Sequence, residues 1–304
     1  MAVKHFLTIE ELSTADILTL LKDAAKLKKD LKAGKKLTSL KGKAIGLIFH
    51  KPSLRTRVSF EAGVAKLGGQ SIFMESDYAT FGIREPIRDH AKVMSRYVDG
   101  IVIRTFDHDK MLEFAKNSDV PVINGLTDYN HPCQAVTDLF TVKEHFKTLS
   151  SQKLAFIGDG NNVSRSLATI CVKLGVQFAL AHPKGYGFSK DFLAKFSTKE
   201  KSLLQITEKP SEAAKDASVF YSDVFTSMGQ EAESAKRIKI FKGYQVNQEL
   251  VKLGRKDAII LHCLPAHRGE EITAEIIDGP RSLIYEQAEN RMHTQNAIMK
   301  MLIS

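Results

Sequence analysis

The chain has 304 residues, of which 43% are hydrophobic and 26% are charged. This length suits two α/β domains better than one hydrophobic core, and the composition excludes a disordered or fibrous protein. No apolar run approaches the roughly 18 residues that a membrane-spanning helix needs, and residues 1–10 lack the pattern of a signal peptide. Three widely spaced cysteines, Cys133, Cys171 and Cys263, predict free thiols in a reducing compartment, so we expect a cytoplasmic location.

The net charge of +9 arises largely from lysines between Lys22 and Lys43. These lysines follow and overlap an apolar pattern of helical spacing, which favours a solvated helix face and loop over a nucleic-acid contact. No zinc-finger motif or RNA-binding aromatic motif accompanies them. We therefore expect no nucleic-acid partner.

Hydrophobic periodicity predicts a first helix and then an alternation of strands and helices. Ser13 and Asp16 have the spacing of a capping box, and apolar residues repeat at helical spacing from Ile17 to Leu27. Apolar runs bounded by turn residues predict strands at 44–49, 71–74, 100–104, 120–123, 153–157, 176–181, 203–206, 217–221 and 258–262. Further helices are predicted at 60–67, 87–97, 110–116, 134–146, 166–174 and 287–302.

This alternation predicts an α/β protein with two doubly wound parallel-sheet domains joined by helices. In such sheets, ligands bind at the carboxyl ends of the strands. The polar stretch 145–153 predicts the domain boundary, so we expect domains at 1–147 and 148–286. Residues 287–304 are expected to form a C-terminal helix that returns to the first domain.

The most specific local motif is His-Lys-Pro-Ser-Leu-Arg-Thr-Arg at 50–57, between a predicted buried strand and a helix. A turn that leads into a helix exposes free amide groups at the positive end of the helix dipole, and Ser53, Arg55 and Thr56 add donors. Because arginine binds phosphate through two parallel hydrogen bonds, the motif indicates a site for a small phosphorylated ligand. An ordinary capped helix with surface arginines fits the local pattern equally well.

Two clusters with histidine and cysteine lie near the ends of predicted strands. His131 precedes Gln134 by three residues, and His262 is followed directly by Cys263. Such side chains can polarise a carbonyl group, orient an amide or act as a nucleophile. Their spacing matches no CxxC or HExxH metal motif, so we expect no metal ion. Cys133 is expected to be a packing residue.

Two loops of the second half also carry polar groups. Gly158 and Gly160 begin like a dinucleotide-binding motif, but Val163 occupies the position of the third glycine, so we expect no nicotinamide cofactor. The glycines are predicted to allow a tight turn that presents Asn162 to a ligand. The segment 223–229 offers an acidic residue and a hydroxyl that could bind an amino-acid head group, although in isolation a simple loop is the simpler interpretation.

Taken in order, these segments resemble the carbamoyltransferase family over nearly the whole chain. The matching segments are Ser53-x-Arg55-Thr56-Arg57, Arg104, His131-Pro132-x-Gln134, Gly158 to Asn162, Asp223 to Gly229, His262-Cys263-Leu264-Pro265 and Glu289-Asn290-Arg291. The Asp-x-x-x-Ser-Met-Gly pattern at 223–229 is similar to that of the members that use ornithine. The resemblance implies transfer of the carbamoyl group of carbamoyl phosphate to the side-chain amine of L-ornithine, without a cofactor or a metal.

The resemblance also implies roles for individual residues. The first domain would bind carbamoyl phosphate through Ser53, Leu54, Arg55, Thr56, Thr80, Arg104, His131, Gln134 and Arg291, together with Cys263 and Leu264 from the second domain. The second domain would bind ornithine through Asn162, Asp223, Ser227 and Met228, with Asp223 on the α-ammonium group. Arg104, His131 and Cys263 would act in catalysis.

Three positions depart from the family pattern. Leu54 stands where many ornithine enzymes have Thr, Thr80 where a Gln is usual, and His90 where Thr is common. The missing Gln removes one expected contact to carbamoyl phosphate, which predicts a lower affinity for this substrate.

The implied mechanism is electrostatic stabilisation without a covalent intermediate. Arg104, Thr56 and His131 would donate hydrogen bonds to the carbonyl oxygen as it becomes an oxyanion. Arg55 and Arg57, with Ser53, would hold the departing phosphate, and Arg57 would in part support the loop. The identity of the general base stays open, with the phosphate oxygens of the substrate as one candidate.

Alternatives within the family are transfer to an N-acylornithine or to putrescine. From other classes, the βαβ alternation and Gly158-x-Gly160 suggest an NAD(P)-dependent oxidoreductase, and the lysines suggest a nucleic-acid-binding protein; neither explains the ordered motifs. The resemblance further implies a homotrimer or an assembly of trimers, and arginine biosynthesis is the expected pathway.

Overall fold

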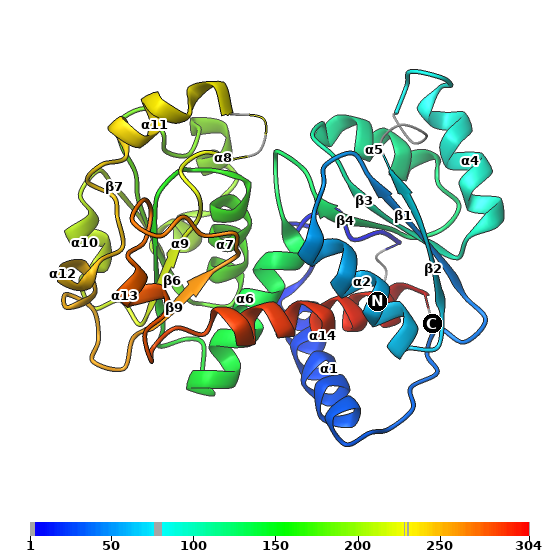
Figure 1. Ribbon diagram of the computed structural model, residues 1–304, viewed down its shortest axis with the longest axis horizontal. Coiled ribbons are helices and arrows are strands. Elements are labelled where there is room, and N and C mark those ends of the chain that lie inside the picture. Colours follow the sequence, from blue (N-terminus) through cyan, green and yellow to red (C-terminus); the bar gives the residue numbers. More distant parts are fainter. Residues whose placement is uncertain (1–3, 76–80, 228, 230, 304) are drawn as a thin grey trace. The chain divides into compact units, whose positions relative to one another are not determined.

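The computed structural model describes residues 4–75, 81–227, 229 and 231–303. The chain forms two compact units, each built on a parallel sheet (Figure 1). Unit 1 comprises Met1–Phe140 and Glu289–Ser304, and unit 2 comprises Thr141–Ala288. The fold class predicted from the sequence is therefore confirmed. The division falls within the helices α6 (Pro132–Phe146) and α14 (Ile284–Ile303); of the predicted limits, 147 lies one residue after α6 and 286 lies in the first turn of α14.

Unit 1 contains a four-stranded parallel sheet in the order β2-β1-β3-β4. Its strands are β1 (Ala44–Phe49), β2 (Gln70–Glu75), β3 (Gly100–Arg104) and β4 (Val122–Leu126), and its helices, besides parts of α6 and α14, are α1 (Thr14–Lys32), α2 (Leu54–Lys66), α4 (Ile87–Tyr97) and α5 (His108–Asn117). Figure 1 shows α2 on one face of the sheet and α4 and α5 on the other. Right-handed crossovers require this arrangement when the strand order reverses.

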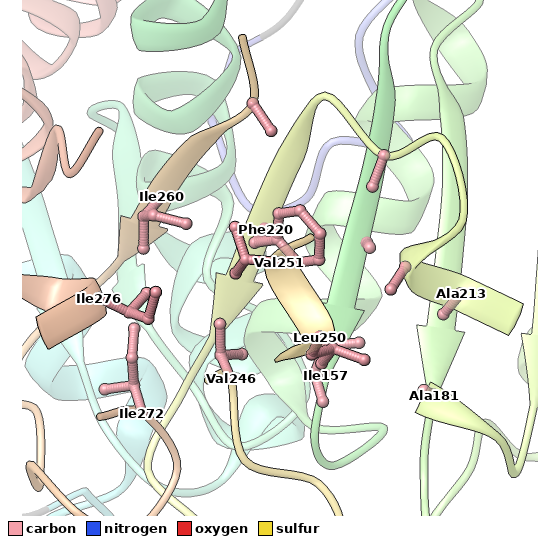
Figure 2. Packing of buried hydrophobic residues seen from close by; sticks show 14 of the residues in the cluster. Ile157, Ala181, Ala213, Phe220, Val246, Leu250, Val251, Ile260, Ile272 and Ile276 are labelled. Carbon is pink, nitrogen blue, oxygen red and sulfur yellow. The ribbon is translucent and has the colours of Figure 1, made fainter. Parts of the chain in front are cut away.

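Unit 2 contains a five-stranded parallel sheet in the order β7-β6-β5-β8-β9. Its strands are β5 (Lys153–Ile157), β6 (Gln177–Ala181), β7 (Leu204–Thr207), β8 (Val219–Ser222) and β9 (Ile259–His262). Its helices are α7 (Asn162–Lys173), α8 (Lys190–Ala194), α9 (Thr198–Lys201), α10 (Pro210–Ala214), α11 (Ser234–Ile240), α12 (Gln248–Val251) and α13 (Ala274–Ile277), with a 3-10 turn at Glu231–Glu233. Figure 2 shows side chains such as Phe220, Val251 and Ile276 packed between the sheet and the short helices.

The predicted elements correspond to the observed ones, with two informative shifts. The capping box of Ser13 and Asp16 is present, which confirms the start of α1. Helix α2 begins at Leu54 rather than at residue 60, because the polar motif itself forms the first helical turn. Strand β4 runs to Leu126 rather than ending at Ile123, because Asn124 and Gly125 are polar or flexible but buried in the sheet. The short helices of unit 2 were not predicted.

Each sheet reverses its strand order at one point, which is where ligands bind in open parallel sheets. In unit 1 the reversal lies between β1 and β3, which end at Phe49 and Arg104. In unit 2 it lies between β5 and β8, which end at Ile157 and Ser222. The motifs at 50–57, 158–162 and 223–229 follow β1, β5 and β8, and Arg104 ends β3, whereas His131 and Cys263 follow the neighbouring strands β4 and β9. Among the described residues, no helix is long and apolar enough to cross a membrane.

Candidate functional site

The turn after β1 leads directly into the first turn of α2. Ser53 is the N-cap residue, and its hydroxyl accepts a hydrogen bond from the amide of Thr56 at 3.3 Å. Leu54 is 74% exposed, so it offers its backbone amide rather than a buried side chain. The half-buried Arg55 has no hydrogen-bonded or ion-paired side-chain partner among the residues that the structure describes. This helix terminus therefore combines free amides, the positive end of a dipole and an uncompensated guanidinium group, which suits an anion.

A buried hydrogen-bond network lies behind this turn and joins α2, α6 and α14. Arg291 donates from Nη1 to Oε1 of Gln134 and from Nη2 to Oγ1 of Thr56, the latter at 2.7 Å. Gln134 in turn donates from Nε2 to Oδ1 of Asp138 at 2.8 Å. Because all four side chains are buried, their positions are fixed by these bonds. The network brings together three of the residues predicted from the sequence to bind the phosphorylated substrate.

Arg104 and His131 add a second buried group within unit 1. Arg104 is the last residue of β3, where the register with β4 shifts so that Arg104 pairs with Leu126. Such a bulge redirects the end of a strand. Burial and the charges of Arg291 and Arg104 hold the pKa of His131 well below its usual value. The imidazole is therefore neutral near pH 7, and the positive charge is carried by the arginines alone.

The loop before His131 is held by buried polar side chains. Asn124 donates from Nδ2 to the carbonyl oxygen of Leu7 at 2.9 Å and also to Oδ1 of Asn130. The thiol of Cys133 donates to the carbonyl oxygen of Asn124 at 3.3 Å. Burial raises the pKa of Cys133 to about 12, so this thiol is protonated and unreactive. Cys133 therefore has the packing role expected from the sequence.

In unit 2, three loops meet at the carboxylate of Asp223. Asn161, which caps α7, donates from Nδ2 to Oδ2 of Asp223 at 2.8 Å. The thiol of Cys263 donates to Oδ1 of Asp223 at 3.1 Å. From the sequence, Asn162 was expected to face a ligand at this turn; the contact of Asn161 with Asp223 was not predicted, although an Asn directly before a helix is a strong capping signal. Asn162 is the first residue of α7 and is half-buried beside it.

A buried histidine, His262, hydrogen-bonds the backbone of the segment after β9. The amide of Leu264 donates to Nδ1 of His262 at 2.9 Å, so the proton of the neutral ring lies on Nε2. That nitrogen lies 3.1 Å from Oε1 of Glu271, which is fully buried. Leu264 adopts a positive φ of 57° and precedes a cis peptide bond to Pro265. These contacts fix the backbone of Leu264 beside the thiol of Cys263.

A second support in unit 2 was not predicted from the sequence. Arg237 is buried, donates to Oδ2 of Asp159 and to the carbonyl oxygen of Phe225, and lies 5.0 Å from the ring centroid of Tyr186. Burial raises the pKa of Asp159, although the guanidinium group of Arg237 opposes this shift. Arg237 thereby joins the turn after β5 to the loop after β8. Its place in a lysine-rich amphipathic segment gave no signal of burial.

One group of described residues has ligand atoms close enough for a metal ion. The ligand atoms of His267, Glu270 and Glu271 lie within 4.8 Å of one another. Oε1 of Glu271 already accepts a hydrogen bond from the amide of His267 at 2.6 Å and faces His262. We do not assign an ion to this group.

The predicted site residues thus fall into two groups, one in each unit. Thr80 and Met228 lie outside the described residues. Unit 1 holds Ser53, Leu54, Arg55, Thr56, Arg104, His131, Gln134 and Arg291, and unit 2 holds Asn162, Asp223, Ser227, Cys263 and Leu264. Arg57, which was expected to hold the phosphate and in part to support the loop, contacts Phe73 and Glu75 of β2. The roles of these residues stay predictions.

Comparison with known proteins assigns the two halves separately. Residues 4–144 match the family model described as aspartate/ornithine carbamoyltransferase, carbamoyl-P binding domain, and residues 150–302 match its Asp/Orn binding domain. An ornithine carbamoyltransferase of Bacillus subtilis is 50% identical over 303 residues, which are 99% of this chain and 94% of that protein. One of Caldicellulosiruptor saccharolyticus is 51% identical over 300 residues, or 98% and 97% of the two chains.

Solved structures give the same assignment. The ornithine carbamoyltransferase from Pyrococcus furiosus superimposes with a TM-score of 0.95 at 42% identity, covering 99% of this chain and 97% of that one. The enzyme from Thermus thermophilus gives 0.91 at 39% identity and covers both chains completely. The chain belongs to the aspartate/ornithine carbamoyltransferase family and is a transferase. The family resemblance and the enzyme class predicted from the sequence are thereby confirmed, and an oxidoreductase is not favoured.

Proposed function

We propose that the chain is an ornithine carbamoyltransferase, which moves the carbamoyl group of carbamoyl phosphate to the side-chain amine of L-ornithine and releases L-citrulline and phosphate. The main support is that the sequence motifs, the topology of the two sheets and the similarity to known enzymes all indicate the same function. The polar groups of each unit lie after the carboxyl ends of the strands at the reversal of its sheet or of the strand next to them, and each unit matches one of the two substrate-binding domains of the family. Full-length relatives that are about half identical bear this name.

Unit 1 would bind carbamoyl phosphate. The amides of the first turn of α2, the hydroxyl of Ser53 and the guanidinium group of Arg55 suit the phosphate, because they offer donors and positive charge at a helix N-terminus. Arg104, Thr56 and the neutral His131 would donate to the carbonyl oxygen as negative charge develops there. Gln134 and Arg291 orient this group through their mutual hydrogen bond, and Gln134 would also hold the carbamoyl amide.

Unit 2 would bind ornithine. Asp223 is a carboxylate for the α-ammonium group, and Asn162, Ser227 and Met228 complete the proposed contacts. Cys263 and the backbone of Leu264 would border the reacting amine and carbon. The attacking amine must be neutral, so one proton leaves ornithine before or during attack. The transfer itself involves no change of oxidation state, so it requires no redox cofactor.

We also propose a cytoplasmic enzyme of arginine biosynthesis that assembles as a homotrimer or a multiple of trimers. The free thiols of Cys133, Cys171 and Cys263 suit a reducing compartment. The trimer follows from the family resemblance. Light scattering on the purified protein measures its mass directly, and a monomeric mass would contradict the assembly.

The function is tested by a citrulline-formation assay with carbamoyl phosphate and a panel of amines. The panel contains ornithine, N-acetylornithine, N-succinylornithine, putrescine and aspartate at equal concentrations. We expect kcat/KM for ornithine to exceed the others clearly. Preference for an acylated ornithine or for putrescine would retain carbamoyl transfer and overturn the second substrate. Absence of transfer to any amine would refute the proposed function.

A further inference from the structure

The second arginine of the phosphate motif, Arg57, is engaged at the outer edge of the sheet. Its guanidinium carbon lies 3.5 Å from the ring centroid of Phe73 on the edge strand β2. Its Nε donates to Oε1 of Glu61 at 3.2 Å, and its Nη1 lies 3.6 Å from Oε1 of Glu75. A planar guanidinium group stacked on a ring and facing two carboxylates has its charge compensated locally. In this arrangement Arg57 resembles a structural brace and differs from Arg55, for which the described part of the chain offers no ion-pair partner.

Phe73 contacts both ends of the phosphate turn. The turn begins after Phe49, whose ring packs edge-on against Phe73 with centroids 5.5 Å apart. It ends in the first turn of α2, where Arg57 stacks on the same ring. The chain therefore enters and leaves the turn over one aromatic side chain. The register of β1 with β2, which pairs Phe49 with Glu75, keeps these contacts at the carboxyl end of the sheet.

We propose that Arg57 is a positioning residue that fixes the phosphate turn through Phe73, and that it does not bind the phosphate itself. Ser53, Arg55 and Thr56 all lie within one helical turn of Arg57, so a rotation of this turn would misdirect each of them together. The inference deepens the proposed function and rests on its carbamoyl phosphate site. Its expected signature is a change in affinity for carbamoyl phosphate with little change for ornithine.

The test is a set of variants of the full-length protein, assayed for citrulline formation. We expect Arg57→Gln to raise KM for carbamoyl phosphate about tenfold and to lower kcat, while KM for ornithine stays within about twofold. Phe73→Leu, which keeps an apolar side chain without the ring, should give a similar rise. The double variant should be no worse than either single variant, because both remove the same contact. Arg57→Lys keeps the charge but not the plane, and should fall between wild type and Arg57→Gln.

The matched control is Arg255 in unit 2, which also faces a ring, that of Phe146 at 5.5 Å, and pairs with Asp257. Arg255→Gln should leave both KM values unchanged. Fully additive effects of Arg57→Gln and Phe73→Leu would overturn the proposal, because a direct phosphate ligand acts independently of Phe73. An affinity of Phe73→Leu for carbamoyl phosphate equal to that of the wild type would also overturn the proposal.

Binding measurements separate this inference from the proposed function. Calorimetric titration of carbamoyl phosphate and of inorganic phosphate requires no turnover. If the wild type binds both anions but forms no citrulline, the proposed function fails. In that case, binding by Arg57→Gln and by Phe73→Leu that is weaker than wild-type binding would still support the positioning role. If the wild type binds neither anion, both the function and the inference fail. Thermal unfolding of each variant confirms that the fold is retained.

Discussion

The two units hold their polar groups in different ways. In unit 1 the candidate phosphate site is built on regular elements: the first turns of α2 and α6, the last residue of β3, and Arg291 within α14. Burial, together with the charges of two buried arginines, lowers the pKa of His131 and keeps this histidine neutral. In unit 2 a single carboxylate, Asp223, lies just after β8 and is held by Asn161 and by Cys263. The first half presents fixed positive charge, and the second presents one negative group supported by neighbouring loops.

This difference follows from what each half would bind. A phosphate dianion and a developing oxyanion are stabilised best by donors that are already oriented, because reorienting them during reaction would be costly. A flexible amino acid with an ammonium group needs one hydrogen-bond acceptor and a binding surface that is complementary in shape. Substitutions should therefore affect the two substrates separately.

The largest effect is expected for Arg55→Ala. Removing a charged donor from a site that stabilises transition-state charge reduces turnover on the order of a hundredfold or more. The measurement is kcat/KM for carbamoyl phosphate, with citrulline as the product. Near-normal turnover at saturating substrates would remove Arg55 from the phosphate site.

A somewhat smaller effect is expected for Asp223→Asn, which preserves shape and removes charge. The loss of a charge-assisted hydrogen bond is worth about 1.5–3 kcal/mol, which corresponds to roughly 10- to 150-fold in kcat/KM for ornithine. Asn161 and Cys263 both donate hydrogen bonds to Asp223. The amide oxygen of the Asn variant can still accept one of these bonds, whereas its NH₂ group cannot accept the other. Equal loss of affinity for carbamoyl phosphate would contradict the division between the units.

Arg237→Lys sharpens the comparison within unit 2. Lysine keeps the charge beside Asp159 but cannot bond Asp159 and the carbonyl of Phe225 together as the guanidinium group does. The loop after β8 should loosen, and we expect KM for ornithine to rise about tenfold with KM for carbamoyl phosphate unchanged. A rise in both KM values by the same factor would indicate general destabilisation.

The smallest expected effect is a loss of thermal stability at acidic pH. The pKa values of His5, His90, His131 and His293, all in unit 1, are lowered mainly by burial, to about 4 for His5. Between pH 6.5 and these lower values the unfolded chain binds more protons than the folded one, so stability falls as pH falls. The thermal midpoint should therefore drop by several degrees from pH 7.5 to 5.5.

His5→Asn provides the matched control for the acid effect. Nδ1 of His5 accepts a hydrogen bond from the amide of Val122 at 3.0 Å, and an Asn side chain can replace this acceptor without titrating. The variant should show a weaker pH dependence than the wild type. An unchanged slope would exclude His5 as a contributor.

The sequence predicted the fold, and it supplied most residues of the candidate site, whose roles stay predictions, where residue type and local position were sufficient. Buried parallel strands such as Gly100–Arg104 are short apolar runs that are visible in the sequence. The local pattern of Ser53, Arg55 and Thr56 is typical of a helix N-terminus that binds an anion. The order of the motifs supplied the family. The alternation of elements also implied that polar loops would gather at strand ends.

What the sequence could not supply depends on contacts distant along the chain. The bond of Arg291 to Thr56 spans 235 positions, and that of Arg237 to Asp159 spans 78. Arg57 lies beside Arg55 in the motif, yet it turns to Phe73, and no local pattern distinguishes the two arginines. The short helices of unit 2 also lack enough turns for a periodic signal.

The most direct test of the division between the units is calorimetric titration of carbamoyl phosphate into the wild type, Arg55→Ala and Asp223→Asn. We expect the wild type and Asp223→Asn to bind with similar Kd, and Arg55→Ala to bind with a Kd at least tenfold higher. Similar loss in both variants, or full binding by Arg55→Ala, would contradict the assignment of the phosphate to unit 1.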